Sequence, residues 1–288
     1  MIDTPITIGE LLQQASSQLI CSESARLDSE ILLLKVLNDS TDRHHTKSWL
    51  LTWPEKTLTT QQVQQFQHYV SLRSKGTPIA YITGEKYFWT LTLNVSSDTL
   101  IPRPETELLV ECALDKLTEK TSLNILDLGT GSGAIALAIA SEHPDCQILA
   151  SDISAEALQI AQNNAHQLSI KNIRFCQSHW FEKINEQRFD MIVSNPPYIA
   201  KSDPELEKNV KDHEPFTALY SGDDGLDDIR EIIQYAENYL TTGGWILFEH
   251  GYTQSSAIQS LLKQYGFTQI ATHNDLNHLP RVTQAQRH

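Results

Sequence analysis

The chain has 288 residues, of which 40% are hydrophobic and 20% are charged. Such a chain can bury the core of one large domain and a smaller one, so a disordered, collagen-like or other fibrous protein is excluded. An excess of 36 acidic over 22 basic residues gives a net charge of −14, a sign that excludes tight non-specific binding to a phosphate backbone.

The N-terminus and the cysteines favour a folded protein of the cytoplasm. The first residues lack the basic segment and apolar run of a secretory signal, and no apolar stretch approaches the length of about 18 residues that a membrane span needs. The four cysteines lie far apart without a Cys-x-x-Cys pair, which argues against a disulfide framework. No His-x-x-x-His or His/Cys cluster occurs, so no metal site is expected.

Residues 1–76 are predicted to form a small helical domain. Thr7 and Glu10 have the spacing of a capping box at the start of a helix. Short amphipathic helices of this kind can share one core. Apolar residues recur at helical spacing in three segments, which contain Leu11, Leu12, Ala15 and Leu19; Leu27, Ile31, Leu34 and Val36; and Val63, Phe66 and Val70.

Residues 77–104 are predicted to be a linker that contains a β-hairpin. Residues 86–93 are rich in aromatic and β-branched side chains, which favour strands. Pro102 and Pro104 follow and stiffen the connection, because each proline ring fixes φ.

Residues 105–288 read as an α/β domain with a parallel sheet. Short apolar runs alternate with helical segments, a pattern typical of parallel strands joined by crossover helices. The excess of acidic residues also belongs to this part, since 26 acidic and 14 basic residues follow position 100. The expected strands lie at residues 123–128, 147–151, 173–176, 189–194 and 245–248.

A glycine-rich turn joins the first of these strands to an alanine-rich helix and predicts a bound nucleoside. Three glycines within residues 129–133 let the backbone approach a ligand that a Cβ atom would exclude. Asp152 ends the next strand, where a carboxylate can accept both hydroxyls of a ribose. The spacing of Gly129, Gly131 and Ala134 also fits a dinucleotide fingerprint, so the loop alone leaves S-adenosylmethionine and a dinucleotide open.

The tetrapeptide Asn195-Pro196-Pro197-Tyr198 follows the fourth predicted strand and indicates an acceptor site for an NH2 group. Open parallel sheets bind ligands beyond the carboxyl ends of their strands, which places this loop beside the glycine turn. The Asn195 side-chain carbonyl and the Pro196 backbone carbonyl can accept the two hydrogens of a planar amide, and Tyr198 can lie against its flat face. The nitrogen lone pair would then face a methyl sulfonium, and displacement could proceed by positioning alone.

With these motifs the chain resembles the bacterial peptide chain release factor glutamine methyltransferases over nearly all of its length. Besides the glycine loop and the Asn-Pro-Pro-Tyr loop, the resemblance rests on residues 78–84, Phe88-Trp89, residues 101–107, residues 177–181, Glu214-Pro215, Ala218-Leu219 and residues 249–251. One departure is His179, since the family commonly has an acidic residue immediately before the position of Trp180.

The resemblance implies a Rossmann-like, seven-stranded class I methyltransferase sheet with a small N-terminal helical domain that helps to dock the substrate. It implies transfer of a methyl group from S-adenosylmethionine to the side-chain amide nitrogen of the glutamine in the Gly-Gly-Gln motif of class I release factors. Asn195, Pro196 and Tyr198 would then be catalytic, and Pro197 would complete the glutamine pocket. The cofactor contacts would be Gly129, Thr130, Gly131, Ser132, Gly133, Asp152, Trp180 and Asn195.

Other functions remain open from the sequence. A sibling family that methylates a glutamine of a ribosomal protein has the same catalytic loop, and so do enzymes that methylate exocyclic amines of nucleic-acid bases. The net charge of −12 after position 100 argues against a nucleic-acid substrate. A nucleotide-binding oxidoreductase or a non-catalytic binding module would use the glycine loop alone. We expect no membrane and no nucleic-acid partner.

Overall fold

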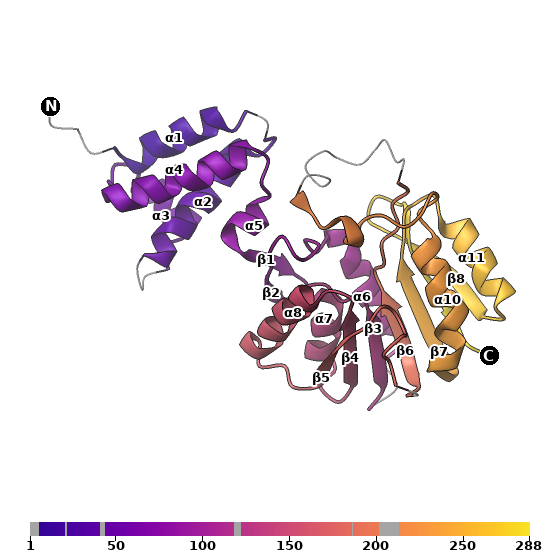
Figure 1. The fold of residues 1–288 in the computed structure, drawn as a ribbon. Coiled ribbons are helices and arrows are strands. Elements are labelled where there is room, and N and C mark those ends of the chain that lie inside the picture. Colours follow the sequence, from indigo (N-terminus) through magenta and orange to yellow (C-terminus); the bar gives the residue numbers. More distant parts are fainter. Residues whose placement is uncertain (1–5, 21, 41–43, 118–121, 186, 202–212) are drawn as a thin grey trace. The chain divides into compact units, whose positions relative to one another are not determined.

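The computed structural model describes residues 6–20, 22–40, 44–117, 122–185, 187–201 and 213–288, and the chain divides into two compact units, residues 1–84 and 85–288. Figure 1 shows the elements of both units. The first unit is helical and the second contains a seven-stranded sheet, so the predicted fold class is confirmed. The division falls after Gly84 rather than after residue 76, because residues 79–83 form another short helix, α5, that contacts α2 and α4.

Among the described residues of the N-terminal unit, five helices share one apolar core. The Thr7–Glu10 capping box is confirmed, since the Thr7 backbone N–H donates to Glu10 at 2.8 Å and the Glu10 N–H donates to the Thr7 hydroxyl at 3.3 Å. The helices are α1 (Ile8–Gln18), α2 (Ala25–Asp39), α3 (Lys47–Thr52), α4 (Thr60–Ser74) and α5 (Ile79–Thr83).

The buried face of α2 differs from the predicted one. Leu27 is 46% exposed, whereas Leu32 and Leu33 are fully buried. Apolar side chains lie around most of this helix, so their spacing cannot select a face, and the packing of α1, α4 and α5 decides it. Asp28 is also buried and forms an ion pair with Arg73 of α4 at 2.7 Å.

The second unit begins with the predicted hairpin, which pairs antiparallel strands around Trp89 and Thr90. Its core is the sheet, in the order β5-β4-β3-β6-β7-β9-β8, with β9 antiparallel to its neighbours. The strands are β1 (Glu85–Phe88), β2 (Leu91–Asn94), β3 (Asn124–Leu128), β4 (Gln147–Asp152), β5 (Ile173–Gln177), β6 (Phe189–Ser194), β7 (Leu240–Glu249), β8 (Thr268–Asn274) and β9 (Pro280–Gln286).

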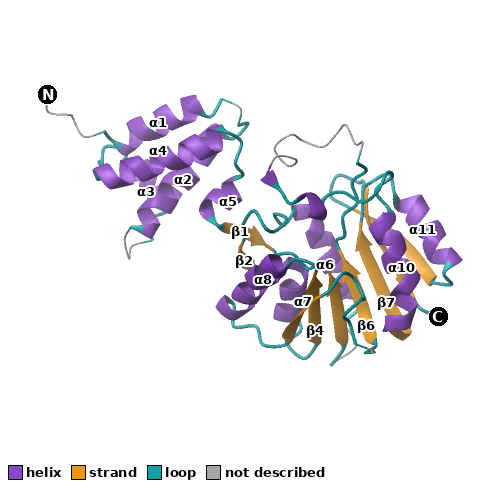
Figure 2. Cartoon of the chain, viewed as in Figure 1, coloured by secondary structure: helices purple, strands orange, loops and turns teal. Residues whose placement is uncertain are grey.

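Helices cover both faces of the sheet, as Figure 2 shows. One apolar cluster joins α6 and α7 to the sheet, and a second joins α10 and α11 to it. All five strands expected from the apolar runs are present, and β7 is longer than predicted. The helical elements are η1 (Pro104–Thr106), α6 (Glu107–Asp115), α7 (Ala134–Glu142), α8 (Ala155–Gln167), η2 (Phe216–Ala218), α10 (Asp227–Tyr239) and α11 (Ser255–Gln264).

The strand order places the two sequence motifs beside each other. Strand β3 pairs with β4 on one side and with β6 on the other, so the direction of the connections changes between β3 and β6. Leu128 at the end of β3 lies opposite Ser194 at the end of β6, and the Ser194 hydroxyl donates to the Leu128 carbonyl at 2.8 Å. The glycine loop and the Asn-Pro-Pro-Tyr loop therefore leave the sheet from paired positions, where open α/β sheets bind ligands.

Candidate functional site

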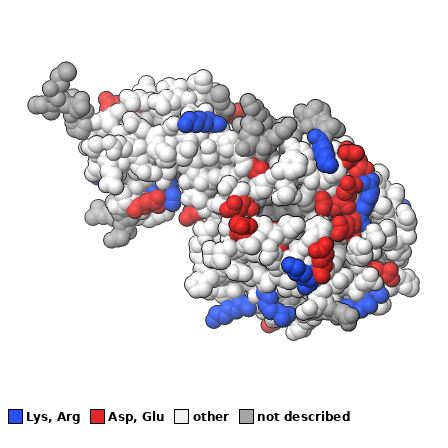
Figure 3. Space-filling model, in the orientation of Figure 1, with Lys and Arg blue, Asp and Glu red and all other residues white. Residues whose placement is uncertain are grey.

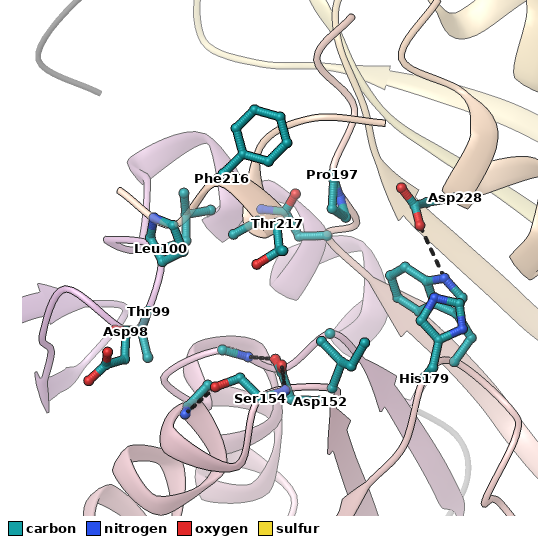
Figure 4. A pocket seen from close by; sticks show the side chains of 18 of the residues that line it. Asp98, Thr99, Leu100, Asp152, Ser154, His179, Pro197, Phe216, Thr217 and Asp228 are labelled. Carbon is teal, nitrogen blue, oxygen red and sulfur yellow. Dashed lines mark hydrogen bonds between the residues drawn. The ribbon is translucent and has the colours of Figure 1, made fainter. Parts of the chain in front are cut away.

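A cavity of about 320 Å³ opens at the carboxyl ends of the parallel strands. Figure 4 shows side chains that line it. Six of the residues predicted to bind cofactor or substrate line this cavity, and they come from four separate segments of the sequence. They are Gly129, Gly131, Asp152, Trp180, Asn195 and Pro197.

Gly131 lies in the left-handed region at φ +56°, and no atom lies within 4 Å of the position that a Cβ atom would occupy. The tight turn therefore needs glycine for its backbone conformation, and the missing side chain leaves room for a ligand. Gly129 lies against the indole of Trp180, since a Cβ atom there would be 3.4 Å from the ring. This part of the loop is an open backbone surface with an aromatic neighbour.

Three residues of the glycine loop do not line the cavity and instead contact the protein around the loop: Thr130, Ser132 and Gly133. The Thr130 hydroxyl donates to Asp127 at 2.6 Å, and the Ser132 carbonyl accepts from the Asn164 amide at 2.9 Å. Gly133 precedes α7 as its N-cap residue, and a Cβ atom on it would lie 2.9 Å from the Leu137 side chain. Their role as direct cofactor contacts stays a prediction.

Asp127 is fully buried beneath the glycine loop. Loss of hydration raises the pKa of its carboxyl group to about 7, partly countered by the Thr130 hydrogen bond. Its Oδ1 atom has no hydrogen-bond partner among the described residues. Burial thus destabilises the ionised form of the Asp127 carboxyl group.

Asp152 ends β4 and lines the cavity with both carboxylate oxygens partly engaged. Oδ2 accepts from the Gly131 N–H at 2.8 Å and Oδ1 accepts from the Ser154 N–H at 2.9 Å, as the dashed lines of Figure 4 mark. Burial raises the pKa of Asp152, and these backbone N–H groups act in the opposite direction. Each oxygen keeps a further lone pair, so a rigidly held carboxylate is available to two hydroxyl groups.

The indole of Trp180 forms the wall beside Asp152. Its Nε1 donates to Asp228 Oδ1 at 3.1 Å, which fixes the ring with its Cζ3 and Cη2 carbons near Gly129. The neighbouring His179 also lines the cavity, with Nδ1 at 3.6 Å from a carboxylate oxygen of Glu231. Asp228 was not predicted, because it lies on α10, 48 positions further along the chain than the indole that it accepts from.

Asn195 and Pro197 line the cavity, whereas Pro196 and Tyr198 are not among the lining residues. The Asn195 side-chain nitrogen donates to the Thr106 hydroxyl at 3.2 Å. Tyr198 instead packs against the apolar cluster that joins α10 and α11 to the sheet, and its phenol O–H donates to Glu249 Oε1 at 3.1 Å. Burial and the Glu249 carboxylate raise the pKa of Tyr198 far above its usual range. The direct substrate contacts of Pro196 and Tyr198 stay predictions.

Two segments that were not predicted as site residues complete the cavity wall. Residues 98–100 lie on one side, and Phe216, Thr217, Ala218 and Tyr220 lie on the other. An ion pair between Arg103 and the buried Glu214 ties the two segments together. Arg103 and Glu214 both lie in segments that carry the family resemblance, so that resemblance could have identified these two parts of the cavity wall.

No group of three or more His, Cys, Asp or Glu side chains in the described part of the chain is placed to hold a metal ion. In the same residues, no helix has the length and apolar character needed to cross a membrane.

Comparison with known proteins gives matches along almost the whole chain. The chain is 48% identical over 272 residues to the release factor glutamine methyltransferase of Escherichia coli, covering 94% of this chain and 96% of that protein. It is 44% identical over 284 residues to the protein of the same name from Vibrio cholerae, covering 98% and 97%. Residues 10–84 match the PrmC N-terminal domain, and residues 104–211 match the methyltransferase small domain.

Among solved structures, a Thermus thermophilus 16S rRNA methyltransferase in complex with AdoMet and guanosine has a similar fold. The TM-score is 0.51 at 19% identity, over 71% of this chain and 50% of that one.

Proposed function

Because the chain belongs to the release factor glutamine methyltransferase family, we propose that it methylates the side-chain amide nitrogen of the glutamine in the Gly-Gly-Gln motif of class I release factors. The methyl donor is S-adenosylmethionine, and the enzyme acts in the cytoplasm. The observation that carries the proposal is that Asn195 shares one cavity with Gly129, Gly131 and Asp152.

The cavity fits S-adenosylmethionine by size and chemistry. Its volume of about 320 Å³ lies at the lower end of the usual range for small-molecule sites, about 300–1,000 Å³. Asp152 offers acceptors for the ribose hydroxyls, Trp180 offers a flat apolar surface beside the base, and the glycine backbone leaves room for the methionine part. When bound, S-adenosylmethionine supplies an electrophilic methyl group on a sulfonium.

Asn195 orients the acceptor in the proposed reaction. Its side-chain nitrogen is engaged by Thr106, so its oxygen is left to accept one N–H of the substrate amide. The Pro196 carbonyl accepts the other N–H, and Pro197 and Tyr198 bound the pocket. A resonance-delocalised amide nitrogen is a poor nucleophile, and fixing both hydrogens directs its lone pair toward the methyl carbon. The proton leaves after methyl transfer, so the reaction needs no strong general base.

The protein substrate is attracted by charge and docked by the N-terminal unit. Acidic side chains gather over the region of α10 in Figure 3, and the residues after position 100 carry a net charge of −12. This sign favours a basic protein surface over a nucleic acid. The glutamine methyltransferases of ribosomal proteins remain the second candidate, and the names of the relatives favour release factors.

Transfer of a tritiated methyl group to purified release factors tests the proposal. We expect label in wild-type factor and none in a factor whose Gly-Gly-Gln glutamine is replaced by alanine. Labelling of ribosomal protein but not of release factor would refute the substrate assignment.

The Asn195→Ala variant tests the role of the acceptor loop. Its affinity for S-adenosylmethionine, measured by calorimetry, should stay within a few-fold of wild type, while methyl transfer falls by about 100-fold, equivalent to roughly 3 kcal/mol. Near-normal turnover would show that Asn195 does not orient the amide.

A further inference from the structure

Gln254 is a half-buried side chain that the reaction described above does not use. It is the N-cap residue of α11, in the short connection that follows β7. Its Nε2 donates to the Tyr198 carbonyl at 2.9 Å, with the carbonyls of Gly225 at 3.2 Å and Asp224 at 3.3 Å. Its Oε1 accepts from the Gly251 N–H at 2.9 Å. One side-chain amide thus joins three segments: the Asn-Pro-Pro-Tyr loop, the loop before α10 and the turn after β7.

The partners of Gln254 fix the direction of its amide group. A backbone carbonyl only accepts and a backbone N–H only donates, so a reversed amide would set its oxygen against three carbonyls and its nitrogen against the Gly251 N–H. The junction is also tightly packed, since a Cβ atom on Gly225 would lie 2.2 Å from the Tyr198 carbonyl oxygen and 2.7 Å from Gln254 Nε2. Gln254 therefore holds the Tyr198 carbonyl in one place.

The Asn-Pro-Pro-Tyr loop needs such an anchor because of its two prolines. A proline has no N–H, so neither of them can tie the loop down as a backbone donor. Their rings also fix φ and restrict the residue before each of them, which makes the segment stiff. The Ser194 hydroxyl holds the start of the loop to β3, and Gln254 holds its end at Tyr198. A shift at Tyr198 is therefore passed back along the loop to Asn195.

The same side chain connects the acceptor site with the opposite wall of the cavity. Gly225 leads into α10, where Asp228 accepts from the indole of Trp180 at 3.1 Å. Trp180 and Asn195 line the same cavity, and Gln254 joins the segments that hold them. We propose that Gln254 is a positioning residue that keeps the Asn-Pro-Pro-Tyr loop at a fixed distance from the proposed cofactor site.

This inference rests on the proposed function for its kinetic test and has a separate spectroscopic one. Gln254→Met keeps the length of the side chain but removes its donor and its acceptor. We expect kcat for methyl transfer to fall by about tenfold or more, because small displacements of reacting groups cost much of the rate. Gln254 does not line the cavity, so the dissociation constant for S-adenosylmethionine should stay within about threefold, with an unchanged number of sites in calorimetry. Gln254→Glu keeps the acceptor for Gly251 and loses the donor, and should lower kcat at least as much.

Two controls separate positioning from a loss of structure. Gln259 lies on the same helix and donates to the Thr272 hydroxyl at 2.8 Å, so Gln259→Met also removes a side-chain hydrogen bond and should leave kcat unchanged. In an Asn195→Ala background, Gln254→Met should cause a smaller loss of kcat than in wild type, since the side chain that it helps to place is gone. A loss of structure would give the same factor in both backgrounds. An undiminished kcat in Gln254→Met, or losses that multiply in the double variant, would overturn the inference.

Nuclear magnetic resonance tests the placement of the loop without any substrate. Tyrosine labelled with carbon-13 at the carbonyl, combined with nitrogen-15 isoleucine, marks the two Tyr-Ile pairs of the sequence, Tyr81-Ile82 and Tyr198-Ile199. In Gln254→Met the signal of the second pair should move while that of the first stays in place. In protein labelled with nitrogen-15 asparagine, the side-chain amide signal of Asn195 should move as well, and Gln259→Met should move none of these signals.

The two kinds of measurement fail separately. If wild type fails to label release factors but the Tyr198 and Asn195 signals move in Gln254→Met, the proposed function fails and the inference stands. If labelling occurs and neither kcat nor the Asn195 signal changes in this variant, the inference alone fails.

Discussion

Replacement of Asp127 by asparagine should stabilise the second unit, residues 85–288, most strongly at high pH; this unit is called the catalytic unit below. Asp127 is fully buried, and desolvation raises the pKa of its carboxyl group from 3.8 to about 7. Between these two values the folded state binds more protons than the unfolded state. Burial of this group therefore costs no stability below pH 3.8, where it is protonated in both states. The free energy of unfolding falls as the pH rises from 3.8 to about 7 and stays lowered above that.

The pKa values set the size of this effect. Each pH unit between them is worth about 1.4 kcal/mol, so the penalty in wild type is about 2 kcal/mol at pH 5 and about 4 kcal/mol at pH 8. An asparagine whose oxygen accepts from the Thr130 hydroxyl places its NH2 group at the partnerless Oδ1 position. That cost does not depend on pH, so the test is the change between the two pH values, about 2–3 kcal/mol.

Native-state hydrogen exchange measures this change in the free energy of unfolding for the catalytic unit alone. Peptides that cover β3 and β6 report the opening of the catalytic unit at pH 5 and pH 8, without a contribution from the N-terminal unit. The difference in free energy of opening between Asp127→Asn and wild type should grow with pH. A difference that stays constant from pH 5 to pH 8 would refute the assigned ionisation of Asp127.

Three further predictions concern the cofactor, a loop and the N-terminal unit. Asp152→Ala should weaken binding of S-adenosylmethionine by about 1.5–3 kcal/mol, because it removes charged hydrogen bonds to the ribose; an unchanged dissociation constant in calorimetry would place the ribose elsewhere. Gly225→Ala should lower the urea midpoint of the catalytic unit, since Gly225 has φ +76° and a Cβ atom would lie 2.2 Å from the Tyr198 carbonyl oxygen; equal midpoints would contradict the close contact. Arg73→Leu should destabilise the N-terminal unit by about 3 kcal/mol at pH 7, because it leaves buried Asp28 unpaired. The pKa of Asp28 is lowered in the folded state, so this loss should shrink as the pH falls below 3.8, and a loss that ignores pH would argue against the ion pair.

The sequence predicted those parts of the fold that depend on neighbouring residues. The Thr7–Glu10 capping box and the strand at residues 189–194 were correct because their signals are local. The buried face of α2 was wrong at Leu27, because contacts with other helices select that face. Strands β8 and β9 were not assigned from apolar runs and followed only from the resemblance to a seven-stranded family.

In the candidate site, too, local motifs predicted some residues, whereas contacts between distant residues were missed. Motif spacing found Gly131, Asp152 and Asn195, since the carboxyl ends of parallel strands meet at one edge. It did not find Thr106, which contacts Asn195 across 89 positions of the sequence. Nor did it find the hydrogen bond from Tyr198 to Glu249, which follows from the pairing of β6 with β7. Partners so distant along the chain are set by strand order, which local patterns do not contain.

The pairing of Leu128 with Ser194 also sets the length scale of the chemistry. The glycine loop and the Asn-Pro-Pro-Tyr loop, the proposed donor and acceptor sites, begin one residue beyond strands held at the interstrand spacing of about 4.8 Å. Methyl transfer needs the methyl carbon and the acceptor nitrogen close together. In the proposed reaction, the hydrogen-bonded pairing of β3 with β6 fixes the distance between the two binding sites before either molecule binds. Surface loops of this enzyme can therefore change in length and composition without changing the distance between the proposed methyl donor and acceptor sites.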